Sequence, residues 1–502
     1  MSGGGNEAMA DRVDAPSRRE LFIAGRERPP SGGAYAPITD PSTLEPLGEV
    51  AVATADDARA AVEAAAAVEE RWGSTPGHER ARLLRTVADR LAQDRASLAR
   101  TIAREVGKPI RDARGEVDRA VGVFRFAAEE IRHLTGESFP ADAFERPAGN
   151  EHRFLFTVRD PIGVVVAIGP FNFPLNLLAH KVAPALAAGN PVVVKPTSAA
   201  PLTAYRLADH LAAAGFPAGT VNVVSGPGGA VGDALVEHPS TRLVTFTGST
   251  DVGRHIAERA ARHAHRVILE MGGLDPFVVL DDASVEPTAA AAALGAFSYS
   301  GQVCTASKRL LVQDGIADRF ARALAERAGR LTVGPALDES TDVGPLIDGR
   351  AVERIDAMVR EARARSAELL VGGDRPSGRR TGHFYLPTVL DRVDPASTVV
   401  REEPFGPIAP IVRFRDEDEA AAIANGTPYG LQAAVYTRDL SRAFRFAKRL
   451  RAGGVHINDP TTLRWDALPF GGIKASGVGR EGLRYAMEEM TEVKLISVNY
   501  AT

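Results

Sequence analysis

The segment GVVVAIGPFNFPLNLLAHKVAPALAAGNPVVVKP, residues 163–196, contains the pattern from which the fold class can be predicted. It begins and ends with apolar runs of strand length, 163–169 and 191–196, separated by a segment of helix length. The same alternation continues downstream with VNVVSG (221–226), LVTFTG (243–248) and RVILEMGG (266–273). Strands separated by helices form parallel βαβ units with right-handed crossovers. The pattern therefore predicts an α/β domain built on an open parallel sheet.

A second alternating block predicts a second domain of the same class. It runs from PFVVLDD (276–282) to VHIND (455–459). Upstream of the first block, the pattern is helical: Thr54 can cap one helix, and Gly107 can end a second amphipathic run. The last segment, TEVKLISV (491–498), has strand character and needs a pairing partner, which a second subunit could supply. We expect two open parallel-sheet α/β domains and a terminal strand.

The composition excludes several classes of protein. With 502 residues the chain is long enough for two or three domains. Its 60 basic and 64 acidic residues give a formal charge of −4, which argues against nucleic acid or an anionic membrane as the main partner. No apolar run has the ~18 residues of a membrane span, and the start of the chain lacks the apolar core of a signal peptide. We expect a cytoplasmic protein whose residues 1–18 form a disordered tail.

Cys304, in GQVCT (301–305), is the only cysteine of the sequence. A single thiol forms no intramolecular disulfide, and it cannot supply the several thiolates of a structural metal site. It is therefore either a buried filler or a nucleophile. The sequence has no Gly-x-Ser-x-Gly elbow, no Walker A motif and no His-Glu-x-x-His, and its scattered histidines suggest no metal site.

Glycine-rich turns follow two of the predicted strands. SGPGGAVG (225–232) contains Gly228, and FTGSTDVG (246–253) contains Gly248. Such turns expose backbone N–H groups and a helix N-terminus to anions, although each could simply be a tight turn. Lys195 lies at the C-terminal end of a predicted strand, which is where open parallel sheets bind their ligands.

Two further polar residues are candidates for catalysis. Glu270 ends an apolar strand just before a Gly-Gly turn, so it is either a solvated strand end or a general base whose pKa burial would raise. Asn172, in GPFNFP, is held between aromatic and proline neighbours. A rigid amide in this setting can donate to a developing oxyanion, whereas most such asparagines only make turns.

Six motifs that occur in fixed order, namely FNFP, VVVKP, FTGS, LEMGG, GQVC and EEPFGP, together resemble the aldehyde dehydrogenase superfamily. The match extends over nearly the whole chain. The resemblance implies an NAD(P)+-dependent, non-acylating oxidoreductase that forms a homodimer or homotetramer. It also implies a Rossmann-like cofactor domain (19–139 and 155–271), a catalytic domain (272–470) and a small β oligomerisation element (140–154 and 486–502).

The resemblance assigns a role to each catalytic candidate. Cys304 would attack the aldehyde carbon to form a thiohemiacetal, whose oxyanion the Asn172 amide and the Cys304 backbone N–H would hold. After oxidation, Glu270 would activate the water that hydrolyses the thioester. A thiol suits both steps, because its thiolate is strongly nucleophilic and is also a good leaving group.

The resemblance also implies a set of cofactor contacts. Lys195 and Glu403 match the residues that hold the two riboses, and Phe405 matches the residue against the nicotinamide. The remaining candidates line the diphosphate turn or the neighbouring cleft: Gly248, Ser249, Pro170, Phe171 and Gly228. Members selective for NAD usually carry glutamate three residues after the lysine, and here that residue is Ser198. Since no carboxylate would repel a 2′-phosphate, we expect NADP to be used, alone or together with NAD.

The expected substrate is a small aldehyde that is hydroxylated or anionic. CTASKR (304–309) and the segments 455–472 and 479–494 are similar to the branch that oxidises lactaldehyde, succinate semialdehyde, phosphonoacetaldehyde or, without phosphorylation, glyceraldehyde 3-phosphate. Arg119 and Arg464 are candidates to bind an anionic end, although either could be a surface arginine.

Two positions beside the nucleophile, Val303 and Thr305, are further substrate candidates. Several relatives with phosphorylated or phosphonate substrates carry arginine where this chain has Val303, which argues against a phosphate group. Another departure is Leu274, which follows LEMGG where lysine is common in the family. The residues suggest no physical account of this replacement.

Three alternatives to this reading are a CoA-acylating enzyme, a catalytically silent binding protein on the same fold, and a thiol hydrolase. Many acylating members lack the glutamate of LEMGG, so Glu270 favours hydrolysis. The presence of Asn172, Cys304, Glu270 and Glu403 together argues against a silent protein. No histidine is placed to activate Cys304 as in a hydrolase.

Overall fold

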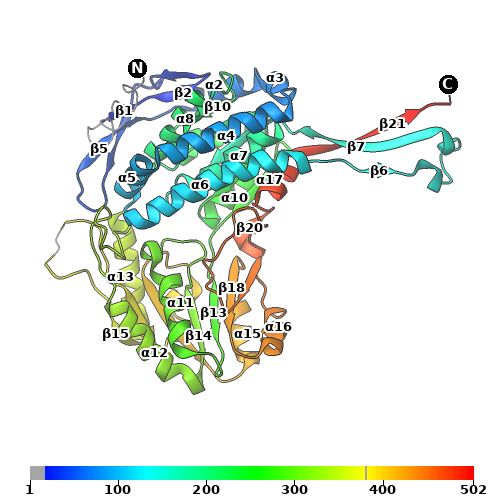
Figure 1. Ribbon diagram of the computed structural model, residues 1–502. Helices are drawn as coiled ribbons and strands as arrows, with labels where there is room; N and C mark the ends of the chain where they lie inside the picture. The colour runs from blue at the N-terminus through cyan, green and yellow to red at the C-terminus, as the bar shows by residue number, and fades with distance from the viewer. Residues whose placement is uncertain (1–16, 379–380, 502) are drawn as a thin grey trace.

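The computed structural model describes residues 17–378 and 381–501, which form two α/β units and a projecting β arm (Figure 1). Residues 1–16 of the expected disordered tail lie outside the described residues. The other part of that expectation is wrong, because Ser17 and Arg18 belong to strand β1 (Ser17–Arg19). β1 joins β5 (Pro46–Ala51) and β4 (Tyr35–Thr39) in a small three-stranded sheet.

The first α/β unit is built on an eight-stranded sheet in the order β20-β12-β11-β8-β9-β10-β2-β3. Its central strands are parallel: β8 (Val164–Ile168), β9 (Val192–Lys195), β10 (Val221–Val223), β11 (Thr241–Thr247) and β12 (Arg266–Glu270). Antiparallel pairings add β2 (Leu21–Ile23), β3 (Arg26–Arg28) and β20 (Gly477–Val478) at the edges.

Both faces of this sheet are buried, which explains the continuous apolar runs of its strands. Val165 and Val192 belong to one hydrophobic core, while Val164 and Val193 belong to the core on the other face.

The helices of this unit are α2 (Ala55–Ala66), α3 (Glu69–Gly73), α4 (Gly77–Gln93), α5 (Arg95–Val106), α6 (Ile110–Glu130), α7 (Asn176–Ala188), α8 (Leu202–Ala214), α9 (Asp233–Val236), α10 (Thr250–Ala261) and α17 (Leu483–Glu489).

The predicted helix signals near the N-terminus are present in the structure. Thr54 caps α2 through a reciprocal pair of hydrogen bonds with Asp57, and Gly107 ends α5 with a φ of 71°. The second amphipathic run is divided at Asp94, between α4 and α5. The carboxylate of Asp94 binds Arg206 and His210 of α8, and this ties the break to the neighbouring helix.

The second unit is built on a seven-stranded sheet in the order β15-β16-β17-β14-β13-β18-β19, in which only β15 pairs antiparallel. Its strands are β13 (Pro276–Val279), β14 (Arg309–Gln313), β15 (Glu368–Val371), β16 (Thr388–Asp391), β17 (Ile408–Phe414), β18 (Gln432–Tyr436) and β19 (Gly454–Ile457). Its helices are α11 (Val285–Phe297), α12 (Asp314–Gly329), α13 (Gly349–Ala364), α14 (Thr398–Arg401), α15 (Glu417–Asn425) and α16 (Leu440–Ala447). The predicted fold class, α/β with two open and mostly parallel sheets, is confirmed.

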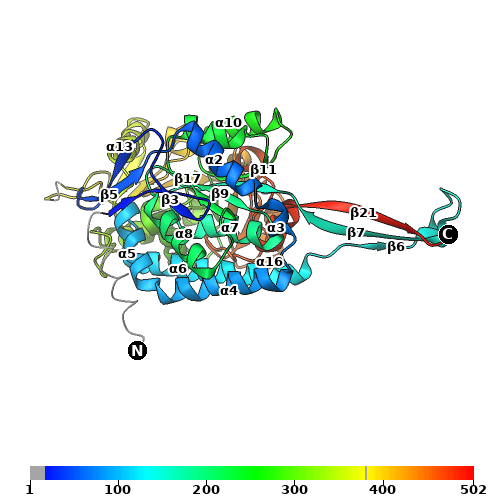
Figure 2. The ribbon, with the colours of Figure 1, turned by 90° about the horizontal axis from the view of Figure 1, so that it is seen from above.

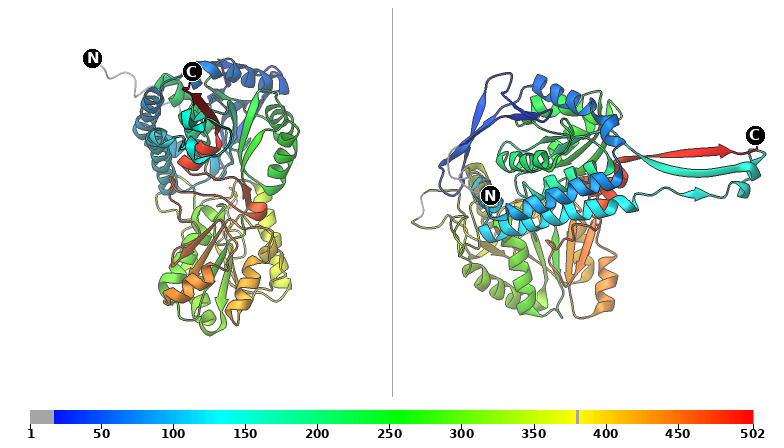
Figure 3. Two further views of the ribbon diagram at one scale, coloured as in Figure 1. Left: turned by 90° about the vertical axis from the view of Figure 1, so that its right-hand side faces the viewer. Right: turned by 45° about the horizontal axis from the view of Figure 1, so that its top comes forward.

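A three-stranded antiparallel arm extends away from both units (Figures 2 and 3). It consists of β6 (Ser138–Phe139), β7 (Arg153–Pro161) and β21 (Thr491–Asn499). The terminal strand β21 therefore finds its partner, β7, within the same chain. The arm also includes residues on both sides of the predicted segment 140–154, since β6 begins at 138 and β7 continues to 161.

Candidate active site

A cavity of about 940 Å³ lies at the carboxyl ends of the parallel strands of the first sheet, where it meets loops of the second unit. Gly169 and Pro170 follow β8, Lys195 ends β9, and Gly248 follows β11. The second unit contributes Cys304, Glu403 and Phe405 together with the segment before and within the start of α13. The cavity thus brings together motifs that lie far apart in the sequence.

The nucleophile candidate Cys304 is presented by a backbone of unusual conformation. The preceding 3-10 turn η5 (Ser298–Gly301) contains three successive residues with positive φ: Tyr299 (47°), Ser300 (57°) and Gly301 (69°). Two hydrogen bonds hold this conformation, from Tyr299 Oη to the Val106 carbonyl (3.0 Å) and from Ser300 Oγ to the Gly344 carbonyl (2.7 Å). Such strain persists only where the surroundings enforce it, so the segment that leads to Cys304 is held in one position.

Burial dominates the electrostatics of Cys304. It raises the pKa of the thiol to about 12, while the positive charges of Lys308 and Arg464 oppose the shift. The charges of Glu270 and Asp275 act in the same direction as burial. The thiol is therefore protonated in this state, and the two cations provide the electropositive part of its surroundings.

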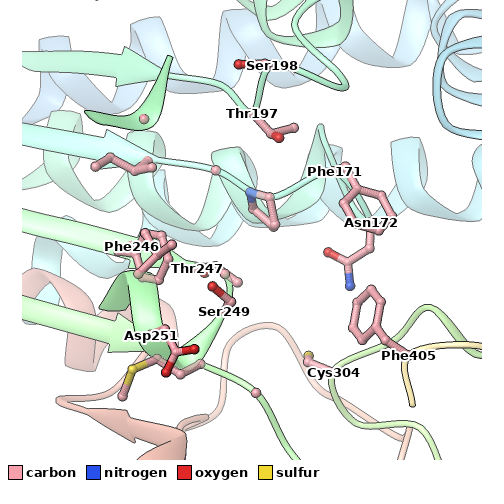
Figure 4. Close-up of a pocket in the computed structure, with 18 of the residues that line it drawn as sticks. Phe171, Asn172, Thr197, Ser198, Phe246, Thr247, Ser249, Asp251, Cys304 and Phe405 are labelled. Atoms are coloured by element: carbon pink, nitrogen blue, oxygen red, sulfur yellow. The ribbon is translucent and has the colours of Figure 1, made fainter. Parts of the chain in front are cut away.

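Asn172 is 2% exposed and is oriented by two hydrogen bonds. Its Nδ2 donates to the Gln302 carbonyl (3.0 Å), and its Oδ1 accepts the Phe173 N–H (3.1 Å). Because Oδ1 is occupied by this backbone donor, Nδ2 is the atom that faces the nucleophile segment. In Figure 4, Asn172, Cys304 and Phe405 lie together at one end of the cavity.

Glu270 is buried at the end of β12 with 3% of its surface exposed. Neither carboxyl oxygen has a hydrogen-bond partner among the described residues. Burial raises the pKa of Glu270 well above its ordinary value, and the negative charge of Glu481 adds to the shift. Burial thus favours the protonated carboxyl group, and the Glu270 side chain does not line the cavity.

The other end of the cavity combines features that fit an anionic dinucleotide. Burial lowers the pKa of Lys195 to about 8, and its Nζ contacts the Pro196 carbonyl (3.4 Å) with no carboxylate partner in the described part of the chain. Ser198 donates to the Gly226 carbonyl (3.2 Å), and the space around Gly228 is open. An unpaired buried cation beside an open glycine turn suits a phosphate-bearing ligand.

The remaining cofactor candidates also line this cavity. Gly248 precedes Ser249, the N-cap of α10, and a Cβ at Gly248 would overlap the Phe246 ring. The Phe171 ring packs edge-on against Phe405 at 5.8 Å between centroids. Figure 4 shows Ser198 and Thr197 at the end of the cavity away from Cys304. An extended ligand could therefore reach from Ser198 to the nucleophile.

Glu403 is held by two donors. Its Oε1 accepts the Gly273 N–H (3.2 Å) and lies 3.0 Å from Nζ of Lys308. Because Glu403 lines the cavity between Gly272 and Phe405, its carboxylate is available to a ligand in that space.

The four substrate candidates lie outside the lining of the cavity. Val303 and Thr305 are buried, and Val303 packs into the core of the first unit. Arg119 forms a bidentate ion pair with Asp466, through Nε at 3.0 Å and Nη2 at 2.6 Å. Arg464 pairs with Glu481 at 2.9 Å. Each arginine is therefore already paired with a carboxylate of this chain.

Several charged residues beside the site are not predicted by the sequence patterns. Asp466 accepts hydrogen bonds from Arg119 and contacts Nε2 of His180 at 2.9 Å, and Lys181 pairs with Glu481 at 2.8 Å. Lys181 lies in α7, all of whose residues are buried. A lysine within a mostly apolar helix indicates a buried counter-charge, and this signal could have led to Glu481.

Two other kinds of site, a membrane span and a metal centre, are absent from residues 17–378 and 381–501. No helix of this part of the chain is long and apolar enough to cross a bilayer. The same residues contain no group of three or more histidine, cysteine, aspartate or glutamate side chains arranged to hold a metal ion.

The model of the aldehyde dehydrogenase family matches residues 29–496 of this chain. The chain belongs to the aldehyde dehydrogenase family. This aldehyde dehydrogenase is 39% identical to the NADP(+) succinate-semialdehyde dehydrogenase of Escherichia coli strain K12, over 96% of this chain and 98% of the relative. It is also 39% identical to the lactaldehyde dehydrogenase of Methanocaldococcus jannaschii, over 92% and 97% of the two chains.

Solved structures agree with this assignment. A crystal structure of an NADP-dependent enzyme from E. coli superposes on this aldehyde dehydrogenase with a TM-score of 0.92 and 39% identity, and it covers 96% of this chain and 98% of that chain. The expectation of an oxidoreductase of this family is therefore confirmed.

Proposed function

We propose that this aldehyde dehydrogenase oxidises a small hydroxylated or anionic aldehyde to its carboxylic acid, with NADP or NAD as the acceptor. One observation carries the proposal: Cys304, Asn172, Glu403 and Phe405 line one end of a cavity whose other end contains Lys195. A nucleophile, an oxyanion donor and a binding surface for an anionic dinucleotide thus share one space.

The first chemical step belongs to Cys304 and Asn172. The thiolate of Cys304 attacks the aldehyde carbon, a C–S bond forms, and the carbonyl π electrons move to oxygen. Nδ2 of Asn172, oriented by its contact with the Gln302 carbonyl, donates a hydrogen bond to this oxygen together with the Cys304 N–H. When bound, a nicotinamide dinucleotide supplies the two-electron acceptor for oxidation of the adduct.

The second step is hydrolysis of the thioester. Glu270 takes a proton from water as the water oxygen attacks the acyl carbon, and the Cys304 thiolate leaves. Burial favours the protonated form of Glu270, whereas the general base of this step is its ionised form. Lys181 and Arg464, whose positive charges oppose the raised pKa of Glu270, favour the ionised carboxylate.

Cofactor choice is proposed from Ser198. Its hydroxyl group lies near the turn at Gly226 and Gly228, and it leaves no negative charge at that position. NADP therefore meets no repulsion of its 2′-phosphate there. The E. coli relative, named as an NADP(+) enzyme, supports this choice.

The class of substrate is proposed from the charges around Cys304. The positive charges of Arg464 and Arg119 act on Cys304 although neither side chain lines the cavity, so they would favour an anionic or polar aldehyde bound there. Relatives are named for lactaldehyde, succinate semialdehyde and 3-sulfolactaldehyde, which are hydroxylated or anionic. Asp466 already occupies two donors of Arg119, which favours a hydroxyl or a single negative charge over a dianion.

The first test measures formation of reduced nicotinamide with a panel of small neutral and anionic aldehydes and with each cofactor. Wild type should turn over, and Cys304→Ala should show no turnover while it still binds NADP. No reduction of either cofactor by wild type, or reduction only when coenzyme A is added, would contradict the proposal.

A second test addresses the anionic end of the substrate. Arg119→Gln should raise KM for anionic aldehydes by about tenfold and leave KM for neutral aldehydes within twofold, since a charged hydrogen bond contributes roughly 1.5–3 kcal/mol. Equal KM values for every anionic aldehyde in wild type and variant would refute this assignment.

A further inference from the structure

Lys308 is a buried cation that contacts both the nucleophile segment and a carboxylate of the cavity. Its side chain is 2% exposed. Its ammonium group donates to the backbone carbonyl of Cys304, and Nζ lies 3.0 Å from Oε1 of Glu403. One charged group thus joins the peptide of Cys304 to the carboxylate assigned to the cofactor.

The backbone on either side of Lys308 is anchored. The Ser307 N–H donates to the Gly295 carbonyl (2.9 Å), and the Arg309 N–H donates to the Asp275 carbonyl (3.3 Å) at the start of the β13–β14 ladder. Lys308 therefore starts from a fixed point immediately before β14, the central strand of the second sheet. The position of its ammonium group is set by the scaffold rather than by a mobile loop.

Glu403 is confined on its other side by the turn that follows β12. The Gly273 N–H donates to the same oxygen that Lys308 contacts, and a Cβ at Gly272 would lie 2.6 Å from the second carboxylate oxygen. The residue after this turn is the buried, apolar Leu274, which offers Glu403 no charge. In this chain the cation that contacts Glu403 thus comes from position 308.

A buried ammonium group is favourable only when charged partners surround it. Glu403 supplies one such charge, and Asp275, which is 1% exposed, interacts electrostatically with Lys308 as well. On the nucleophile side, Lys308 and Arg464 lower the pKa of the Cys304 thiol against the larger effect of burial, and the charges of Glu270 and Asp275 oppose them. Arg119 adds a further positive charge from α6.

We propose that Lys308 is a positioning residue that couples the reactivity of Cys304 to the placement of Glu403. Its ammonium group favours the thiolate of Cys304, and the same group holds the Glu403 carboxylate where the cofactor contacts it. The statement about Glu403 rests on the proposed function, whereas the statement about Cys304 needs neither aldehyde nor cofactor. Lys308 itself touches no reacting atom.

Two substitutions separate the charge from the hydrogen bond. Lys308→Gln removes the charge and keeps a donor for the Cys304 carbonyl, whereas Lys308→Met removes both. Lys448→Gln makes the same change of charge at an exposed lysine, the C-cap of α16, and serves as the control. Melting temperatures show which variants fold. If Lys308→Met does not fold, Lys308→Gln alone is used for the test.

The first readout is the rate of alkylation of Cys304 by iodoacetamide as a function of pH, which is specific because the chain has one cysteine. Both Lys308 variants should move the pH midpoint upward by about one unit, while the control matches wild type. The second readout is the Kd for NADP by calorimetry, which should rise about tenfold.

A uniform fall in alkylation rate at every pH, with an unchanged midpoint, would show a structural role and would overturn the proposal. A change confined to one of the two readouts would overturn the coupling. If wild type itself does not bind NADP, the proposed function fails, whereas the shift in alkylation still decides the effect of Lys308 on Cys304.

Discussion

At the scale of single residues, the site combines groups whose burial works against their ionisation. Cys304 and Glu270 both have pKa values raised by burial, and each is opposed by nearby cations. If they were exposed to solvent, a thiol and a carboxylic acid would ionise more readily. Water could then also enter the site and cause side reactions. The chemistry therefore depends on where the cations Lys308, Arg464 and Lys181 are placed.

Replacement of Glu270 by glutamine should separate the two halves of the reaction. Glu270→Gln should give one burst of reduced nicotinamide per active site, followed by a steady-state rate lower by about 10²-fold or more, because acylation does not need the base. Rapid-mixing kinetics would show the burst. Absence of a burst, with a slow first turnover, would place Glu270 in the first step instead.

The pH dependence of this variant provides a second check. A general base acts only when deprotonated, so wild-type deacylation should fall as the pH falls through the raised pKa of Glu270. Glu270→Gln should lose this limb of the pH profile. An identical acidic limb in the variant would assign the titration to another group.

Cofactor preference should respond to a single carboxylate at position 198. Ser198→Glu should move the ratio of kcat/KM values toward NAD by about tenfold or more, since a like charge beside the 2′-phosphate costs several kcal/mol. Ser198→Gln, with a similar shape and no charge, is the matched control and should retain NADP use. A wild-type preference for NAD of about tenfold or more would contradict the assignment itself.

At the scale of elements, the turn η5 determines the position of Cys304. Its three positive φ values are enforced by hydrogen bonds to residues 106 and 344, so two distant segments hold the nucleophile loop. Gly301 ends this turn in close contact with the Gly406 carbonyl, next to the Glu403 segment. The loops that carry the nucleophile and Glu403 are thus packed against each other.

A methyl group at Gly301 should disturb this contact. Gly301→Ala combines a positive φ with an overlap on the Gly406 carbonyl, so we expect both a lower melting temperature and a loss of about tenfold or more in kcat. Gly33→Ala has a similar φ of 65° with open space around it and should keep wild-type activity. Equal activity of the two variants would show that the η5 contact does not position Cys304.

At the scale of the whole molecule, the arm leaves apolar side chains exposed to solvent in the single chain. Val493 and Leu495 are 59% and 62% exposed on β21, and Phe154 and Val498 are exposed beside them. An isolated antiparallel ribbon with bare apolar side chains is marginally stable in water. We therefore expect the arm to pack on a second copy of the chain, as the resemblance to the family implied.

Charged residues on the arm should dissociate this assembly. The double variant Val493→Lys, Leu495→Lys should lower the mass measured by light scattering to that of a smaller species, because buried like charges oppose association. Leu44→Arg, at an exposed residue between β4 and β5, is the control, since β5 lies at the end of the molecule away from the arm (Figure 1). A monomeric wild type would contradict the expectation directly.

Much of the site could be predicted because its residues lie at strand ends. Lys195, Gly248 and Glu270 each follow or end an apolar run, and parallel strands bring such ends to one edge. The motifs around Asn172, Cys304 and Glu403 located the rest of the expected site. The ion pairs could not be predicted, since Arg119 and Asp466 are 347 positions apart and either arginine could have been a surface residue.

The alternation of strand and helix follows from local sequence, because a strand buried on both faces must be apolar throughout and a helix must end at its caps. The residue types available for catalysis can likewise be read directly from the chain. Three features appear only in the folded chain: Lys308 reaches Glu403, Glu270 has no hydrogen-bond partner in the described residues, and β21 pairs with β7 of its own chain. The reason is physical: these contacts depend on how the two units and the arm pack, and no local pattern encodes the distance between segments so far apart in the chain.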